Sequence, residues 1–172
     1  GKNLGLVTDR VASIGATITI ERTDESGGRF SNEVQGPWGT VITDPHWSRT
    51  ISFSPPIALW PQELSDRWAK QFITKYSIAG YPGNLYAWQE YMSVHGWEQI
   101  TVPAGTFLTL RYQNLIQYES EDANKVNCIR KETIWFAPSI GRWVVREISG
   151  SYMIAGQLGT PNLEDSYQWQ LT

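Results

Sequence analysis

The stretch WEQITVPAGTF, Trp97–Phe107, decides how this chain folds. Its first half alternates, with Glu98, Ile100 and Val102 on one face, and a period of two is typical of a half-buried β-strand. The Pro-Ala-Gly that follows predicts a tight turn, because proline fixes φ and glycine relieves strain where the turn ends. The stretch therefore predicts a strand, a turn and a second strand.

A second stretch of the same kind is WFAPSIGRWVV, Trp135–Val145. It predicts two more strands, over residues 125–136 and 142–154, joined by a five-residue loop at 137–141. Consecutive strands with short connections pair as antiparallel hairpins.

The rest of the chain repeats this pattern. Residues 1–10 are expected to be a loose lead-in, residues 11–22 form one strand, and prolines 55 and 56 end a later strand. The segment 62–72 is ambiguous between helix and strand; we favour a strand from about 67 to 78 after a short helical turn at 62–66. The sequence predicts an all-β, mostly antiparallel fold of about nine or ten strands with little helix, closed as a roll or barrel or stacked as a sandwich.

Composition limits the function more than it defines it. The chain has 172 residues, which predicts a single domain over 1–172. A net charge of -3 argues against nucleic-acid binding, which needs a basic surface. No apolar run approaches the about 20 residues of a transmembrane helix. Because the chain starts at Gly1 without a leader, we expect that a leader was removed; whether a lipid anchor preceded Gly1 stays open.

The two stretches resemble a family of uncharacterised exported bacterial β-proteins, many of them lipoprotein-like, that form a domain of unknown function. The family pattern is Gly-x-Glu, Thr-Val-Pro-Ala-Gly-Thr-Phe, a long strand, Trp-Tyr-Ala-Pro, a glycine, and a hydrophobic strand that ends in glutamate. Here the pattern falls on Gly96, Glu98, 101–107, 135–141 and Glu147, with Phe136 in place of the tyrosine.

The resemblance covers about residues 55–150. In its entry segment, Pro61, Leu64 and Trp68 match the family, but Ser65 and Asp66 stand where a glycine is usual. The resemblance implies an all-β roll or barrel in the periplasm or cell envelope. It implies no activity, since none is established for the family.

Polar residues of the signature strands are the candidate site. A carboxylate on an inward face needs a partner, because burying an unpaired charge is costly. We therefore predict either a structural salt-bridge network or a ligand pocket inside the fold. The candidate ligand-binding residues are Glu98, Arg111, Arg130 and Glu147 as polar groups, with Trp88 and Trp135 as walls.

Two other readings stay open. The nine tryptophans could form a carbohydrate-binding surface, for which Trp38 and Trp47 are the best exposed candidates, although aromatic residues also fill β-domain cores. A hydrolase would need paired carboxylates at a defined separation. We favour a non-enzymatic β-domain that binds a small-molecule, lipid or glycan ligand or has a structural role.

The sequence predicts no metal site and no cofactor. His46 and His95 are the only histidines, and neither has neighbours at metal-ligand spacing. Cys128, the single cysteine, is expected to be a small packed residue of a strand. Edge strands of an open roll make a homodimer a further expectation.

Overall fold

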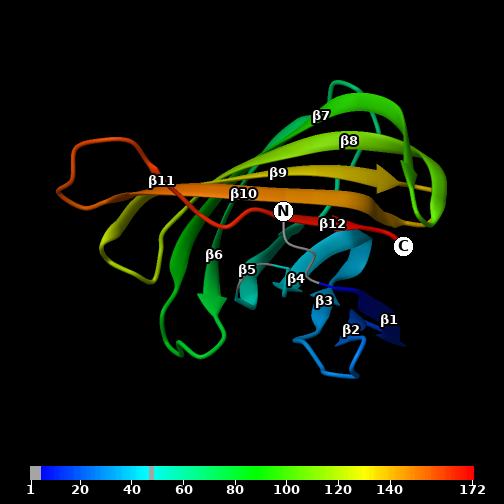
Figure 1. The fold of residues 1–172 in the computed structure, drawn as a ribbon, viewed down its shortest axis with the longest axis horizontal. Helices are drawn as coiled ribbons and strands as arrows, with labels where there is room; N and C mark the ends of the chain where they lie inside the picture. The colour runs from blue at the N-terminus through cyan, green and yellow to red at the C-terminus, as the bar shows by residue number, and fades with distance from the viewer. Residues whose placement is uncertain (1–4, 47–48) are drawn as a thin grey trace. The chain divides into compact units, whose positions relative to one another are not determined.

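The protein is described by a computed structural model that covers residues 5–46 and 49–172, except for the side chain at position 38. Its strands form an antiparallel sheet in the order β1 to β11, and β12 pairs with β10 (Figure 1). The all-β, antiparallel prediction is confirmed. The described strands number twelve rather than nine or ten, and among the described residues no pairing closes the sheet into a barrel.

The chain divides into two compact units, which we describe separately. Unit 1 contains residues 1–60 and 74–85, and unit 2 contains residues 61–73 and 86–172. The prediction of a single domain over 1–172 stays a prediction.

Unit 1 is built from short strands and one 3-10 turn. Its elements are β1 (Val7–Ile14), β2 (Ile18–Asp24), β3 (Glu33–Gln35), η1 (Pro37–Gly39), β4 (Thr40–Asp44) and β5 (Ile51–Ala58), with β6 (Ala69–Ile78) entering from unit 2. The prediction of one strand over 11–22 is wrong. The chain reverses where Gly15 N–H donates to the Thr17 carbonyl, so Ile14 pairs with Ile18 in a hairpin. The expected loose lead-in is also wrong from Val7 onward, since β1 begins there.

The prolines do not end β5, contrary to expectation. Between the pairs Thr43–Ser52 and Val41–Ile57 the register shifts, so residues 53–56 face a single residue of β4. This bulge takes the prolines out of the β4–β5 ladder, to which they could not donate. The Pro55 carbonyl instead accepts a hydrogen bond from Thr74 Oγ1 at 2.6 Å.

Unit 2 is dominated by four long strands that lie side by side in Figure 1. These are β7 (Tyr86–Val102), β8 (Gly105–Tyr118), β9 (Lys125–Ala137) and β10 (Arg142–Ile154), followed by β11 (Asn162–Leu163) and β12 (Tyr167–Gln170). The hairpin predicted from residues 97–107 is confirmed, with Val102 paired to Gly105 across the turn. The strand predicted at 67–78 is confirmed as β6, but a turn closed by Trp68 N–H to the Ser65 carbonyl replaces the helical turn.

Alternation gives β7–β10 one buried face. Met92, Leu110, Ile116 and Val144 are fully buried on these strands, and Ile134 is 1% exposed. We call the face that carries Trp88, Met92, Tyr112, Ile116 and Ile134 the buried face, and the other side of the same strands the opposite face.

Gly96 interrupts the alternation within β7. The register with β8 shifts between Val94 and Gly96, and Gly96 has φ +106°, a conformation that side chains with a Cβ rarely adopt. This β-bulge moves Glu98 to the opposite face, although Glu98 would share the face of Val94 in an unbroken strand.

We predict that Gly96→Ala lowers the free energy of unfolding by about 1–3 kcal/mol, the usual cost of a strained backbone conformation. The reason is conformational, because a Cβ at this position would meet no other atom within 4 Å. Urea denaturation measures the change.

Gly15→Ala is the matched control. A Cβ there also meets nothing within 4 Å, and its φ lies outside the positive range. Equal stability of the two variants would contradict the assigned role of the bulge.

Candidate functional site

The six candidate residues predicted from sequence do not form one site. Trp88 and Arg130 lie on the buried face and contact each other, with Arg130 Cζ 6.0 Å from the centre of the Trp88 ring. Glu98, Arg111 and Trp135 gather on the opposite face.

The opposite-face group is a small, half-exposed polar contact. Trp135 Nε1 donates to Glu98 Oε1 at 2.7 Å, and Arg111 Nε lies 3.4 Å from the same oxygen. The Glu98 and Arg111 side chains are each 39% exposed. An ion pair with that exposure contributes little to stability. The group joins the three strands β7, β8 and β9.

Glu147 lies apart from both groups. Strict alternation would place Glu147 on the face of both Trp143 and Val145, but the register of β10 with β9 shifts between those two residues. Val145 and Glu147 therefore lie on the same face of β10, whereas Trp143 lies on the other face. Glu147 Oε1 accepts a hydrogen bond from Gln168 Nε2 of β12 at 2.9 Å.

The buried face carries the densest group of charged side chains in unit 2. Glu90, Arg130, Glu132 and Arg146 are each no more than 3% exposed. They come from β7, β9 and β10. We call these four residues the buried charge cluster.

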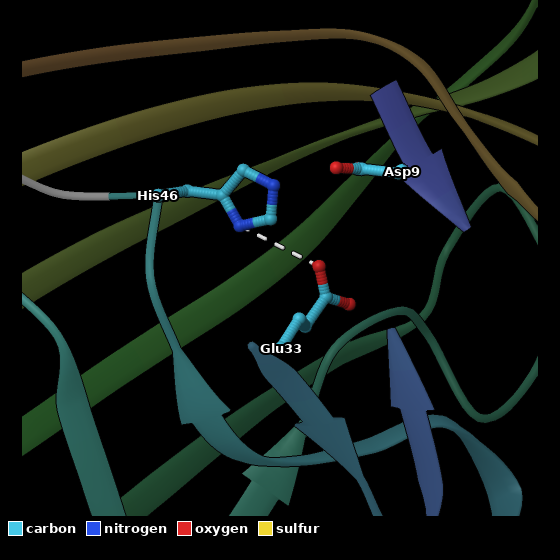
Figure 2. A group of neighbouring side chains, drawn as sticks. All are labelled: Asp9, Glu33 and His46. Atoms are coloured by element: carbon cyan, nitrogen blue, oxygen red, sulfur yellow. Dashed lines mark ion pairs between the residues drawn. The ribbon is translucent and has the colours of Figure 1, made fainter. Parts of the chain in front are cut away.

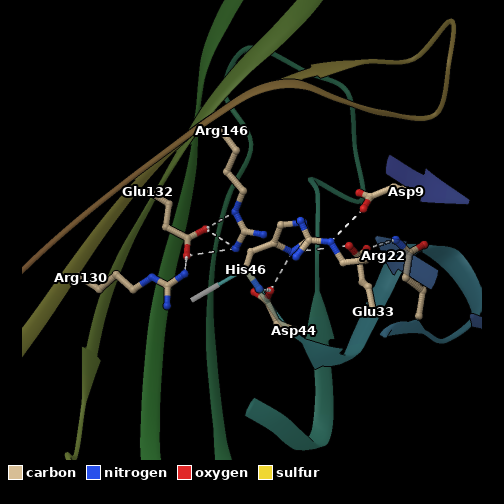
Figure 3. Close-up of polar contacts among 9 residues, drawn as sticks. Asp9, Arg22, Glu33, Asp44, His46, Arg130, Glu132 and Arg146 are labelled. Atoms are coloured by element: carbon tan, nitrogen blue, oxygen red, sulfur yellow. Dashed lines mark hydrogen bonds and ion pairs between the residues drawn. The ribbon is translucent and has the colours of Figure 1, made fainter. Parts of the chain in front are cut away.

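Glu132 is the centre of the buried charge cluster (Figure 3). Its Oε1 lies 2.5 Å from Arg130 Nη2. Its Oε2 accepts from Arg146 Nη2 at 3.0 Å and from Arg146 Nε at 3.3 Å. One carboxylate thus pairs with two guanidinium groups away from water. Removing the carboxylate or a guanidinium group would leave an unpaired buried charge, which lowers stability strongly.

Glu90 is the titratable group of the cluster. Its Oε2 accepts from Trp88 Nε1 at 3.0 Å. Burial, together with repulsion from Glu132, raises the pKa of Glu90 to about 8, although the hydrogen bond from Trp88 and the nearby arginines lower it. Glu90 is therefore protonated at neutral pH.

Two further polar residues lie on the same face. Burial raises the pKa of Tyr112 well above its usual value, so its hydroxyl stays protonated. Asn114 is 5% exposed and lies directly opposite Glu132 across the β8–β9 ladder.

The sequence contained a usable signal for this cluster. Glu90 alternates with Trp88 and Met92 in the sequence, which puts the three on one face of a strand, but only Trp88 and Arg130 of the buried face are among the predicted site residues. Glu132 follows Arg130 at the next inward position and was missed. A charged residue at every second position of an otherwise apolar face is the signal that would have found it.

Unit 1 contains a second group that the sequence analysis missed. Asp9 of β1, Glu33 of β3 and His46 each offer one ligand atom, and these atoms lie within 4.8 Å of one another (Figure 2). His46 Nδ1 lies 3.6 Å from Glu33 Oε2. The three residues are far apart in sequence, so no metal-binding motif with a fixed spacing includes them. They are residues that could hold a metal ion.

Neighbouring side chains hold this group in place. Arg22 Nε donates to Asp9 Oδ1 at 2.8 Å. Gln35 Nε2 donates to Glu33 Oε1 at 2.5 Å. Asp44 Oδ1 lies 3.0 Å from His46 Nδ1 and also accepts from the His46 backbone N–H at 2.8 Å.

The remaining predicted features are located as follows. Trp97 is 41% exposed, whereas Trp88 and Trp143 are buried. Trp47 and the side chain of Trp38, the best candidates for an exposed surface, lie outside the described residues. Cys128 is buried as expected, and burial raises the pKa of its thiol.

No protein-family model matches the chain, and neither a curated protein nor a solved structure is significantly similar to it. The resemblance to exported bacterial β-proteins therefore stays a prediction. In the described part of the chain, no helix is long and apolar enough to cross a membrane.

We predict that Glu132→Gln lowers the free energy of unfolding by roughly 3–5 kcal/mol, because it leaves buried guanidinium charge without its carboxylate. Guanidinium chloride denaturation measures the loss. Glu147→Gln, on the adjacent strand with a single amide contact, should change stability by no more than about 0.5 kcal/mol. Similar losses in both variants would contradict the central place of Glu132.

A separate prediction concerns pH. Glu90 has a model-peptide pKa of 4.5 and a folded-state pKa of about 8. Between these values the unfolded chain ionises Glu90 while the folded chain keeps it protonated, so the free energy of unfolding falls as pH rises through this window. The whole effect is at most on the order of 5 kcal/mol.

Glu90→Gln removes this titration. The stability of the variant relative to wild type should therefore increase from pH 5 to pH 8.5 in thermal or urea unfolding. Glu63→Gln, an exposed change, should follow the wild-type curve throughout. A constant difference between Glu90→Gln and wild type over this range would show that Glu90 does not carry the proton.

Proposed function

We propose that this chain is a non-enzymatic β-protein of the bacterial cell envelope that binds a small or extended ligand at the buried face of β7–β10. The proposed location rests on the resemblance of residues 55–150 to exported, lipoprotein-like proteins. The proposed site rests on the polar groups of the buried face.

A single observation carries the ligand proposal. Glu90 Oε1 and Asn114 Oδ1 are buried side-chain oxygens that have no hydrogen-bond partner among the described residues. The two residues occupy diagonal positions on adjacent strands, since Glu90 pairs with Ile116 and Met92 pairs with Asn114. Buried polar atoms normally have partners, and two lacking them at neighbouring positions favour a bound molecule that supplies hydrogen-bond partners.

The chemistry of the face suggests the ligand class. Asn114 Oδ1 accepts hydrogen bonds, whereas the protonated Glu90 carboxyl can donate one, so the pair favours a ligand with hydroxyl groups, which do both. The ring centroids of Trp88 and Tyr118 lie 6.0 Å apart, and the two ring planes meet at 36°. Aromatic rings provide apolar contact area for the carbon skeleton of such a ligand. A hydroxylated small molecule, such as a polyol or a glycan unit, satisfies both requirements.

The buried face favours this function over a hydrolase. A hydrolase with paired carboxylates would need both of them to reach the substrate, but the Glu132 carboxylate is paired with Arg130 and Arg146.

Native mass spectrometry of protein purified from a bacterial periplasm, beside a denatured sample, tests the proposal. We expect an extra mass in the native sample that disappears on denaturation. Asn114→Leu should remove the extra mass, because leucine deletes one acceptor and fills its space.

Glu98→Gln is the matched control, since Glu98 belongs to the opposite-face group. It should retain the extra mass. A bare polypeptide mass for the wild type would overturn the ligand proposal. Loss of the ligand in Glu98→Gln but not in Asn114→Leu would move the site to the opposite face.

A further inference from the structure

We propose that Asp9, Glu33 and His46 of unit 1 form a binding site for a divalent transition-metal ion, with zinc as the best-fitting probe. The proposal is independent of the ligand site on β7–β10. It uses the only described group of histidine, cysteine and acidic residues whose ligand atoms come this close together.

The first argument is convergence. The ligands come from the first strand of the unit, from β3, and from the residues after β4, and the antiparallel order of these strands brings them together. Zinc ligands lie about 2.0–2.2 Å from the ion in tetrahedral directions, so two ligand atoms are about 3.3–3.6 Å apart. The ligand atoms of this group lie within 4.8 Å of one another, so binding would draw them together by up to about 1.4 Å. Asp9, whose side chain is 21% exposed, is the residue with room to rotate.

The second argument is the orientation of His46. The His46 side chain is 1% exposed. Asp44 Oδ1 accepts hydrogen bonds from the backbone N–H and from the Nδ1–H of His46. A carboxylate at one ring nitrogen is the usual support of a metal-binding histidine, because it fixes the tautomer in which the other nitrogen has a lone pair. In Figure 2 the ring nitrogen remote from Glu33 is turned toward the Asp9 carboxylate.

The two carboxylates are supported in the same way. Gln35 holds one oxygen of Glu33, and the other is the oxygen nearest to the His46 ring. Arg22 holds Asp9 through Oδ1. Supporting contacts of this kind keep metal ligands in place before the ion binds.

The third argument is charge. Three carboxylates, those of Asp9, Glu33 and Asp44, belong to the group or support it. Glu33 and Asp44 are 2% and 5% exposed. The attraction between carboxylates and a divalent cation is stronger away from water than in it.

The donor set points to the class of metal. One imidazole nitrogen with carboxylate oxygens suits zinc or manganese, whereas magnesium and calcium prefer oxygen ligands alone. Three protein ligands would leave a coordination position for water or a ligand, as in zinc sites that are not purely structural.

Isothermal titration of EDTA-treated protein with zinc chloride tests the proposal. We expect one ion per chain, and weaker binding of magnesium. Asp9→Asn and His46→Gln should each weaken zinc binding by at least about tenfold. Asp44→Asn should weaken it by about tenfold to a hundredfold, the usual effect of losing the support of a ligating histidine.

His95→Gln is the matched control, because His95 is the other histidine and contacts Ser93 rather than a carboxylate. It should bind zinc as the wild type does. If His46→Gln does not fold, Asp9→Asn, on the exposed first hairpin, decides the question. Absence of stoichiometric zinc binding, or unchanged binding in Asp9→Asn, would overturn the site and leave His46 as a buried structural partner of Asp44 and Glu33.

Discussion

The pairing of the Glu132 carboxylate with the guanidinium groups of Arg130 and Arg146 is the interaction on which the buried face of unit 2 depends. Arg130, Arg146 and Glu132 would each be expensive to bury alone, and the long strands β9 and β10 could not keep them inward without mutual compensation. On the same face, burial raises the pKa of Glu90, repulsion from Glu132 adds to this, and the two arginines oppose it. The balance keeps the proton on Glu90 at pH 7.

Backbone irregularities decide which charges enter this face. A strand with strict alternation would place Glu98 with Glu90, and the register shift at Gly96 prevents this. The shift in β10 between Trp143 and Val145 has a similar effect, since it separates Trp143 from the side of Glu147. Single inserted residues thus divide the acidic residues of the signature strands between a buried environment and a half-exposed one.

Much of the fold could be predicted from sequence, because alternation and turn residues are local signals. The strands 125–136 and 142–154 and the hairpin at 97–107 were found in this way. The first hairpin was missed because residues 11–22 form an almost unbroken β-favouring run, in which Gly15 is the only turn signal. The candidate site residues were expected together in one pocket. Trp88 and Arg130 do contact each other on the buried face, but Glu98 lies on the opposite face, because a bulge at a glycine is compatible with either register. The group of Asp9, Glu33 and His46 depends on strand pairing between distant segments, which a single sequence does not encode in any spacing.

The burial of Cys128 has a consequence for the chemistry of the chain in an oxidising compartment. The thiolate is the form of cysteine that reacts with oxidants and disulfides. The raised pKa keeps the Cys128 thiol protonated, and its 2% exposure keeps the sulfur away from reagents in solution. A single cysteine on a surface would link two chains covalently under such conditions. Cys128 instead lies on the buried face of β9, where it acts as a small apolar side chain. The folded protein is therefore expected not to form disulfide-linked dimers in an oxidising environment.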